Sequence, residues 1–187
     1  NILTKVDYLV IGGGMANTFL KAQGCEVGRS LLEEDKLGTA SELMKKAKQA
    51  GVKLLLPVDV VVAKEIEAGA ATKVVAADKV PADMRIGDIG PRSIELFSKE
   101  LRKCKTVVWN GPMGVFEVPE FAQGTRSLVK LLAGLEATTI VGGGSSAEAV
   151  EEMGLVNKIT HVSTGGGAWL EFLEGKVLPG VAALLDK

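Results

Sequence analysis

Four glycine-rich clusters hold the residues of this chain that could do chemistry. They are residues 11–14, 109–114, 141–146 and 163–167, each at the end of an apolar run. Glycine lets a ligand approach the main chain closely, and a helix N-terminus offers unpaired N–H groups to anions. For any single cluster, the alternative is that a tight turn requires glycine. Because open parallel sheets bind ligands beyond the carboxyl ends of their strands, the four together predict a phosphate-binding crevice.

The elements that must position these clusters follow from apolar periodicity. Short runs rich in β-branched residues predict strands buried on both faces, at residues 6–11, 52–56, 106–109, 138–141 and 159–162. Helical patterns alternate with them, at residues 15–23, 32–49, 91–103, 121–133 and 146–153. Alternation with short connections predicts an α/β fold with a doubly wound parallel sheet, Rossmann-like, in three layers.

The segment from residue 57 to residue 88 is less regular. Two stretches within it, residues 58–62 and 73–76, are rich in valine and predict either a small antiparallel addition or an edge pair. We place Arg85 in a loop and expect it to be solvated, as a lone surface arginine usually is.

Composition limits the partners of the chain. Its 187 residues are 47% hydrophobic, enough to fill the core of one domain. Lys and Arg number 22 and Asp and Glu number 23, so the net charge is −1. Bulk charge therefore attracts neither nucleic acid nor an acidic membrane, and we expect neither partner. Any anion site must be local.

The two cysteines and the chain end indicate the setting. Cys25 and Cys104 lack metal-ligand spacing and form no disulfide framework, as expected in a reducing compartment such as the cytoplasm. There is no secretory signal and no apolar run of membrane length. The chain opens on Asn1, and residues 1–5 resemble the end of a helix, so we expect an upstream segment to be missing.

Five motifs resemble those of phosphoglycerate kinases, in the family's order along essentially the whole chain. They are IGGGMA at 11–16, LPVD at 56–59, DIGP at 88–91, VVWNGPMGVFE at 107–117 and HVSTGGGA at 161–168. The resemblance implies that residues 1–187 are the C-terminal, nucleotide-binding domain of a monomeric enzyme. The N-terminal domain, which holds the 3-phosphoglycerate site in the family, has no counterpart here.

The resemblance also implies an activity and a set of site residues. The family transfers phosphate reversibly between 1,3-bisphosphoglycerate and ADP, giving 3-phosphoglycerate and MgATP, mainly by positioning and charge neutralisation. By resemblance, the adenine slot consists of Gly13, Gly14, Leu31, Gly87, Pro112 and Val115. Glu117 corresponds to the ribose ligand and Asn110 to a triphosphate contact. The phosphate-binding turn corresponds to Gly143, Gly144, Ser145 and Ser146, and the transferring phosphate to Gly165 and Gly166.

Ser145 departs from the family pattern, in which an aspartate at this position binds the Mg²⁺ of the nucleotide. With Glu148 three residues later, Ser145 fits a capping box and so could simply begin a helix. A hydroxyl is a poor substitute for a carboxylate toward Mg²⁺. We therefore assign no metal ligand, although Mg²⁺ remains the expected cofactor with ADP or ATP.

Other conspicuous residues have structural interpretations. His161 is the only histidine, and we expect it to be packed in its strand rather than reactive, because this phosphoryl transfer needs no obligatory general base. Trp109 and Trp169 favour core or interface packing. The apolar tail from residue 167 to residue 187 predicts a helix over 168–173 whose face is exposed without a partner domain.

Two other functions compete with the kinase reading. A dinucleotide-dependent oxidoreductase is disfavoured because residues 12–15 lack the G-x-G-x-x-G spacing, and no suitable acidic residue follows a second strand. A standalone adenine-nucleotide-binding module without turnover stays open for this chain.

Overall fold

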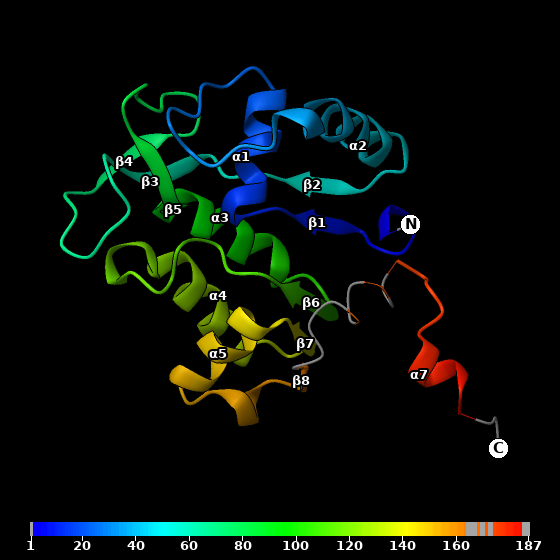
Figure 1. The fold of residues 1–187 in the computed structure, drawn as a ribbon. Helices are drawn as coiled ribbons and strands as arrows, with labels where there is room; N and C mark the ends of the chain where they lie inside the picture. Colours follow the sequence, from blue (N-terminus) through cyan, green and yellow to red (C-terminus); the bar gives the residue numbers. More distant parts are fainter. Residues whose placement is uncertain (1, 164–167, 169–170, 172–173, 185–187) are drawn as a thin grey trace.

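The computed structural model describes residues 2–163, 168, 171 and 174–184, which form alternating strands and helices (Figure 1). The strands are β1 (Tyr8–Val10), β2 (Lys53–Leu55), β3 (Asp59–Ala63), β4 (Lys73–Ala76), β5 (Arg85–Ile89), β6 (Thr106–Asn110), β7 (Thr138–Gly142) and β8 (His161–Ser163). The α-helices are α1 (Gly13–Ala22), α2 (Leu37–Gln49), α3 (Pro91–Leu101), α4 (Gln123–Ala133), α5 (Gly144–Glu152) and α7 (Pro179–Ala182). Short 3₁₀ helices are η1 (Ile2–Thr4), η2 (Glu34–Lys36), η3 (Pro119–Phe121) and η4 (Val156–Lys158).

The parallel strands form two blocks. In one, β1 pairs with β2 so that Tyr8 lies opposite Lys53. In the other, β7 pairs with both β6 and β8, and Thr106 lies opposite Thr138. A strand is present in each of the five predicted ranges, and the expected α/β fold with parallel strands is confirmed. Within the described residues, no strand pairing joins β1 to β6.

In a parallel strand, the main-chain N–H and C=O groups of successive residues point alternately to the two neighbouring positions in the sheet. This alternation identifies the groups of β1 and β6 that face away from their partner strands. Ile11 N donates to β2 (3.0 Å), so the peptide groups of Val10 point away from β2. Lys105 O accepts a hydrogen bond from β7 (2.9 Å), so the peptide groups of Val108 point away from β7. The outer edge of β1 and that of β6 therefore each present main-chain groups without a strand partner among the described residues.

The prediction that the strands are buried on both faces is wrong for β6. Val107 and Trp109 are buried, whereas Thr106, Val108 and Asn110 are exposed, in strict alternation. Val108 is 43% exposed because its side chain borders the large cavity described below. The packing of Trp109 in the core, by contrast, is confirmed.

A third sheet is antiparallel and has the order β4-β3-β5. It confirms the antiparallel addition expected between residues 57 and 88. Its last strand, β5, was not predicted, and the placement of Arg85 in a loop is wrong. Arg85 begins β5, lies opposite Ala63, and its Nε is 3.5 Å from Glu65 Oε2.

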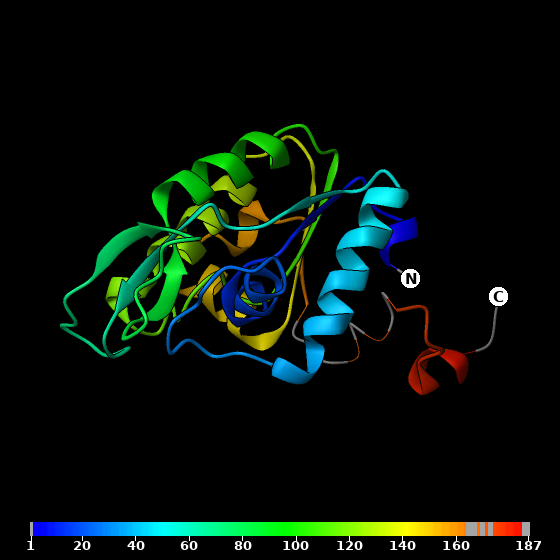
Figure 2. The same ribbon diagram turned by 90° about the horizontal axis from the view of Figure 1, so that it is seen from above.

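Helices lie on both faces of β1 (Figure 2). Leu9 and Ile11 pack toward α1 and α2, in a cluster with Phe19. Tyr8 and Val10 pack on the opposite side, against the main core that α3, α4 and α5 share with β6 and β7. This alternation gives the layered arrangement expected for an α/β domain.

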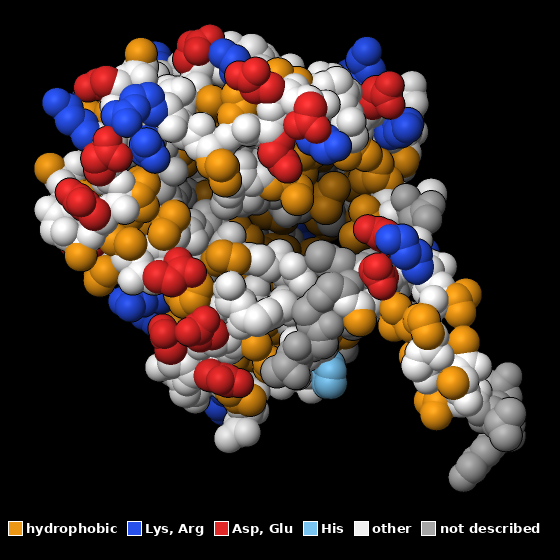
Figure 3. All heavy atoms as spheres, in the orientation of Figure 1, with side chains coloured by type: hydrophobic (Ala, Val, Ile, Leu, Met, Phe, Trp, Pro, Cys, Tyr) orange, Lys and Arg blue, Asp and Glu red, His pale blue; other side chains and the backbone are white. Residues whose placement is uncertain are grey.

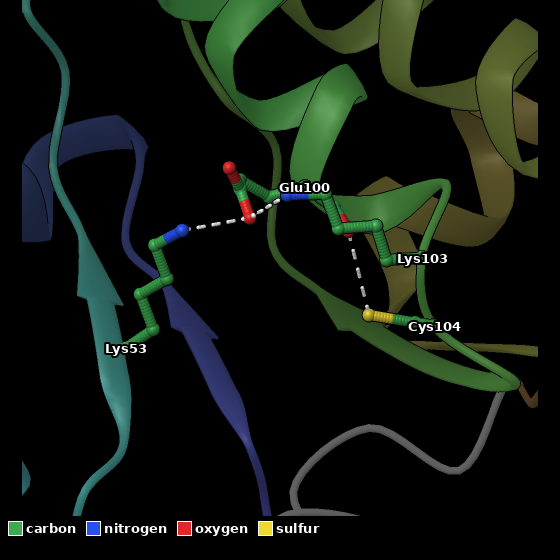
Figure 4. A network of polar contacts seen from close by, with 4 residues as sticks. All are labelled: Lys53, Glu100, Lys103 and Cys104. Carbon is green, nitrogen blue, oxygen red and sulfur yellow. Dashed lines mark hydrogen bonds and ion pairs between the residues drawn. The ribbon is translucent and has the colours of Figure 1, made fainter.

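One ion-pair network joins β2 to α3 (Figure 4). The Glu100 carboxylate, 7% exposed, is 2.9 Å from Lys53 Nζ and 2.8 Å from Lys103 Nζ. Lys103, followed by Lys53, holds the pKa of Glu100 down at about 2. Lys53 Nζ also lies 5.7 Å from the centroid of the Tyr8 ring. The network therefore connects the first parallel block to the helix that packs between the two blocks.

The C-terminal tail ends in α7, which stands apart from the rest of the molecule (Figures 1 and 2). Val177, Val181 and Leu184 are all exposed there. The helix predicted over 168–173 lies largely outside the described residues. Among those that are described, no helix is both long and apolar enough to cross a membrane.

Candidate nucleotide-binding site

A cavity of about 1370 Å³ lies between the two parallel blocks and extends past the carboxyl ends of β1 and β6. Figure 3 shows a hollow in this part of the surface, with hydrophobic side chains along its walls. Eight of the site residues expected from the sequence line it: Gly13, Gly14, Leu31, Gly87, Asn110, Pro112, Val115 and Glu117. Residues far apart in the chain are thus brought to one place.

The first glycine cluster meets the second directly. Gly13 N donates a hydrogen bond to Met113 O (3.1 Å). Gly13 has φ +60, and a Cβ there would lie 2.7 Å from Pro112 O. Any other residue would be strained in its own backbone and would clash with that carbonyl. Glycine at this position therefore allows α1 to start against the loop that follows β6.

Leu31 lies over the start of α1. Its side chain is 77% exposed, and its Cδ2 would be 3.3 Å from a Cβ built on Gly14. The buried Asn17 holds this segment, because its Nδ2 donates to Leu31 O (3.1 Å). Sequence reasoning missed Asn17, although a polar residue within the apolar run of α1 is an unusual feature. Gly14 and the exposed aliphatic side chain of Leu31 thus border the cavity side by side, an apolar lining that suits a planar ring.

The third glycine cluster is tied to the second. Gly111 N donates to Ser146 Oγ (2.8 Å), and Ser146 is fully buried. A Cβ on Gly143 would lie 3.2 Å from Asn110 Nδ2. The residues predicted for the phosphate turn do not line the cavity itself, but they begin α5 beside Asn110.

The capping box predicted at Ser145 is wrong. Gly143, with φ +92, is the N-cap of α5, and no side-chain cap bond is present. Ser145 is an exposed residue in the first turn of α5. The first intrahelical bond runs from Ala147 N to Gly143 O (3.0 Å), which leaves the preceding N–H groups available to an anion. The positive φ decides the helix start, because glycine adopts it without strain.

Magnesium finds no dedicated ligand set here. Across the part of the chain that the structure describes, no group of three or more His, Cys, Asp or Glu side chains could hold a metal ion. Ser145 presents a neutral hydroxyl where a hard divalent cation prefers carboxylate oxygen. These residues therefore do not fit a Mg²⁺ ion bound by the protein itself.

The loop after Gly114 carries two further predicted residues, Val115 and Glu117, both exposed at the cavity. Val115 N donates to Gly87 O (2.9 Å), which fixes the loop to β5. Gly87 is buried, and a Cβ there would run into the ring of Phe121. The loop therefore depends on a glycine in the middle of β5, an antiparallel strand that belongs to a different sheet.

A buried carboxyl group that sequence reasoning did not use lies behind this loop. Asp88 is 1% exposed and also lines the cavity. Its Oδ2 accepts from Gly124 N (2.7 Å) and its Oδ1 from Ile89 N (2.8 Å). Burial raises the pKa of Asp88 to about 7, although these N–H groups act in the opposite direction.

Two other expectations have different outcomes. Gly165 and Gly166 lie outside the described residues. His161, expected to be packed, is exposed at the start of β8. The expectation is wrong because β8 lies at the end of the β6-β7-β8 sheet, where β7 is the only strand among the described residues that pairs with it.

The chain matches known proteins along nearly its whole length. The family model "Phosphoglycerate kinase" matches residues 1–176. The chain is 59% identical over 187 residues to the phosphoglycerate kinase of Pelotomaculum thermopropionicum and 57% identical to that of Moorella thermoacetica. Each alignment covers 100% of this chain and 48% of the relative, so the chain spans about half the length of these relatives.

Solved structures give the same result. The structure of phosphoglycerate kinase from Coxiella burnetii superposes with a TM-score of 0.94 at 46% identity, covering 97% of this chain and 46% of that one. That of phosphoglycerate kinase from Pyrococcus horikoshii OT3 gives 0.75 at 33% identity, covering 96% and 45%. These similarities overturn the oxidoreductase alternative.

Proposed function

Because the chain belongs to the phosphoglycerate kinase family, we propose that residues 1–187 bind ADP or ATP as the C-terminal, nucleotide-binding domain of such an enzyme. The observation that carries the proposal is the convergence of Gly13, Leu31, Val115 and Glu117 around one cavity at the carboxyl ends of parallel strands. These residues come from separate segments of the chain, and their types suit the parts of a nucleotide.

The adenine ring packs against the cavity wall that the backbone of Gly13 and Gly14 forms with the aliphatic side chains of Leu31 and Val115. Both side chains are exposed in the structure, so a ring that covers them removes apolar surface from water. Glu117, exposed on the same loop, accepts hydrogen bonds from the ribose hydroxyls. Gly87 and Pro112 complete the walls of the slot.

The phosphates extend from this slot toward α5. Asn110 donates its side-chain amide to the phosphate chain, and the N–H groups of Gly144, Ser145 and Ser146 bind it in the first turn of the helix. This turn supplies no carboxylate, so any Mg²⁺ would have to be brought by the nucleotide itself. When present, the ion neutralises charge on the phosphates.

The whole enzyme transfers phosphate reversibly between 1,3-bisphosphoglycerate and ADP, a step of glycolysis in the cytoplasm. Such transfer depends on positioning and charge neutralisation, to which this chain contributes the nucleotide site and the backbone of Gly165 and Gly166. The phosphoglycerate site belongs to the other half of the protein, so residues 1–187 alone bind nucleotide without measurable turnover. A coupled assay of this chain that gives the rate of an intact two-domain enzyme would overturn that expectation.

Calorimetric titration with ADP and ATP, with and without Mg²⁺, tests the binding proposal. Glu117→Ala should weaken ADP binding by roughly tenfold, the effect of losing hydrogen bonds to a charged group, without changing the thermal stability. Glu136→Ala removes another exposed carboxylate, outside the cavity, and is the matched control. Equal ADP affinity in the Glu117→Ala and Glu136→Ala variants would remove Glu117 from the site. No binding by the unmodified chain would reject the function itself.

A further inference from the structure

Asp88 is a buried acid that forms no ion pair with any described residue. Its carboxylate is 1% exposed, and its hydrogen bonds come from main-chain N–H groups, Gly124 N at 2.7 Å and Ile89 N at 2.8 Å. Burying a carboxylate without a positive partner is costly. Such a group is retained where its hydrogen bonds hold several segments in one arrangement, and the surroundings of Asp88 have this character.

Two glycines from other segments pack directly onto the carboxylate. A Cβ on Gly114, in the loop after β6, or on Gly124, at the start of α4, would overlap Asp88 Oδ1. The carboxylate thus fills the space in which the loop, the helix start and the end of β5 meet. The three segments can approach this closely only because both neighbours lack side chains.

Through these contacts Asp88 acts on the residues proposed to bind nucleotide. It immediately follows Gly87, whose carbonyl accepts the hydrogen bond of Val115 N (2.9 Å). The α4 start that Asp88 holds also supplies Thr125 Oγ1, which accepts from Met113 N (3.0 Å). Asp88 is therefore linked to that loop at two positions, Met113 and Val115.

Charged side chains on β5, β3 and η3 are engaged elsewhere. On β5, Arg85 lies within ion-pair distance of Glu65, and on β3 the Asp59 carboxylate accepts from Arg92 N and Ser93 N. In η3, Glu120 accepts from Gly69 N.

Arg126 and Lys130 of α4 and Glu117 of the loop are exposed. The pKa of Asp88 is raised by burial and lowered by main-chain hydrogen bonds alone, with no contribution from an ionised neighbour. The protonation of Asp88 is thus sensitive to how tightly the loop and helix start are held.

We propose that Asp88 is a positioning residue whose ionised carboxylate holds the loop of residues 111–118 and the start of α4 in the arrangement that binds adenine nucleotide. The inference rests on the proposed function. When Asp88 is protonated, one oxygen becomes a donor facing N–H donors, a main-chain bond is lost, and the loop loosens. Nucleotide binding favours the ionised form and is therefore weaker at acid pH.

The test compares ADP affinity of the unmodified chain and of Asp88→Asn by calorimetry between about pH 6 and about pH 8. Ionisation of the ADP phosphate affects both proteins equally and cancels in the ratio of their affinities. The affinity of the unmodified chain divided by that of Asp88→Asn should rise by about threefold or more between these pH values. One proton limits this rise to about tenfold per pH unit. Asp83 is an exposed acid in the turn before β5, so Asp83→Asn is the matched control. The affinity of the unmodified chain divided by that of Asp83→Asn should not change with pH.

A second measurement uses only the unmodified chain, so it does not depend on whether the Asp88→Asn variant folds. The carboxyl ¹³C shift of Asp88 in the unmodified chain reports its titration directly, and saturating ADP should move its midpoint to lower pH. An affinity ratio that is constant with pH, or a midpoint that ADP leaves unchanged, overturns the inference while ADP binding itself persists. Absence of ADP binding at every pH rejects the proposed function instead.

Discussion

Ser146 Oγ accepts a hydrogen bond of 2.8 Å from Gly111 N, and this single contact joins the loop after β6 to the first turn of α5. A second main-chain bond, from Gly13 N to Met113 O, joins the same loop to the start of α1. These two hydrogen bonds thus join three glycine clusters that lie at residues 11–14, 109–114 and 141–146. The loop between them is the central part of the candidate site.

Ser146→Ala should therefore loosen the site from its phosphate end. Losing a partly buried hydrogen bond costs about 1 kcal/mol of unfolding free energy, and ADP affinity should fall because Gly111 and Asn110 are no longer held against α5. Ser145→Ala is the matched control, since Ser145 is exposed in the same turn. Urea unfolding and ADP titration of the two variants check this. Equal losses in both would show that the buried contact has no special role.

Glu100 should make the chain sensitive to acid. Its pKa is lowered from an ordinary value of 4.5 to about 2, first by Lys103 and then by Lys53. Because the folded pKa lies below the unfolded one, the ionised form contributes stability above about pH 4.5, and this contribution is lost as the pH falls toward about 2. Glu100→Gln should lower stability at neutral pH and flatten the slope in that window. Denaturant midpoints measured along a pH series decide it, and parallel curves for both proteins would contradict the assignment.

Asp88 should act with the opposite sign. Burial raises its pKa from 3.8 to about 7, so the folded state holds a proton that the unfolded state releases. The stabilising contribution is therefore complete below about pH 3.8 and is lost as the pH rises through about 7. Asp88→Asn removes this titration, so its stability relative to the unmodified chain should increase between these values. Thermal melts across that range give the measurement, and a constant difference in stability would exclude titration of Asp88.

Substitutions at two adjacent valines of β6 test whether the face of this strand that borders the cavity is exposed to solvent. Val107 is 6% exposed within the main core, whereas Val108 is 43% exposed at the cavity. Val107→Thr should cost about 1–3 kcal/mol because it buries a hydroxyl, while Val108→Thr should stay within about 0.5 kcal/mol, as surface changes usually do. Similar losses in urea unfolding would mean that both faces of β6 are covered in solution.

The helices and parallel strands could be predicted because apolar periodicity is a local property of the sequence. Strand β5 could not, since Arg85, Gly87 and Asp88 interrupt any apolar pattern, and the strand forms only by antiparallel pairing with β3. The serine and glutamate of the expected capping box did not begin α5, because Gly143, a glycine at positive φ, caps the helix two residues earlier.

The candidate site could be predicted from motifs to the extent that its members line one cavity. Asn17 and Asp88 were missed because their roles depend on burial and on main-chain partners distant in sequence. A single sequence shows neither of these properties. The same reason explains why the exposure of His161, set by the edge position of β8, was not foreseen.

The last prediction concerns Ser145, which is exposed at the start of α5 and has a neutral side chain. Ser145→Asp places a carboxylate beside the N–H groups proposed to bind phosphate. The helix tolerates it, because an acid in the first turn interacts favourably with the helix dipole. Mg²⁺ prefers charged oxygen, so the variant should bind MgATP with a greater dependence on Mg²⁺, by roughly tenfold for one added ligand. Titration of ATP with and without Mg²⁺, for both proteins, gives the ratio. If Mg²⁺ changes the ATP affinity of both proteins by the same factor, residue 145 does not contact the ion.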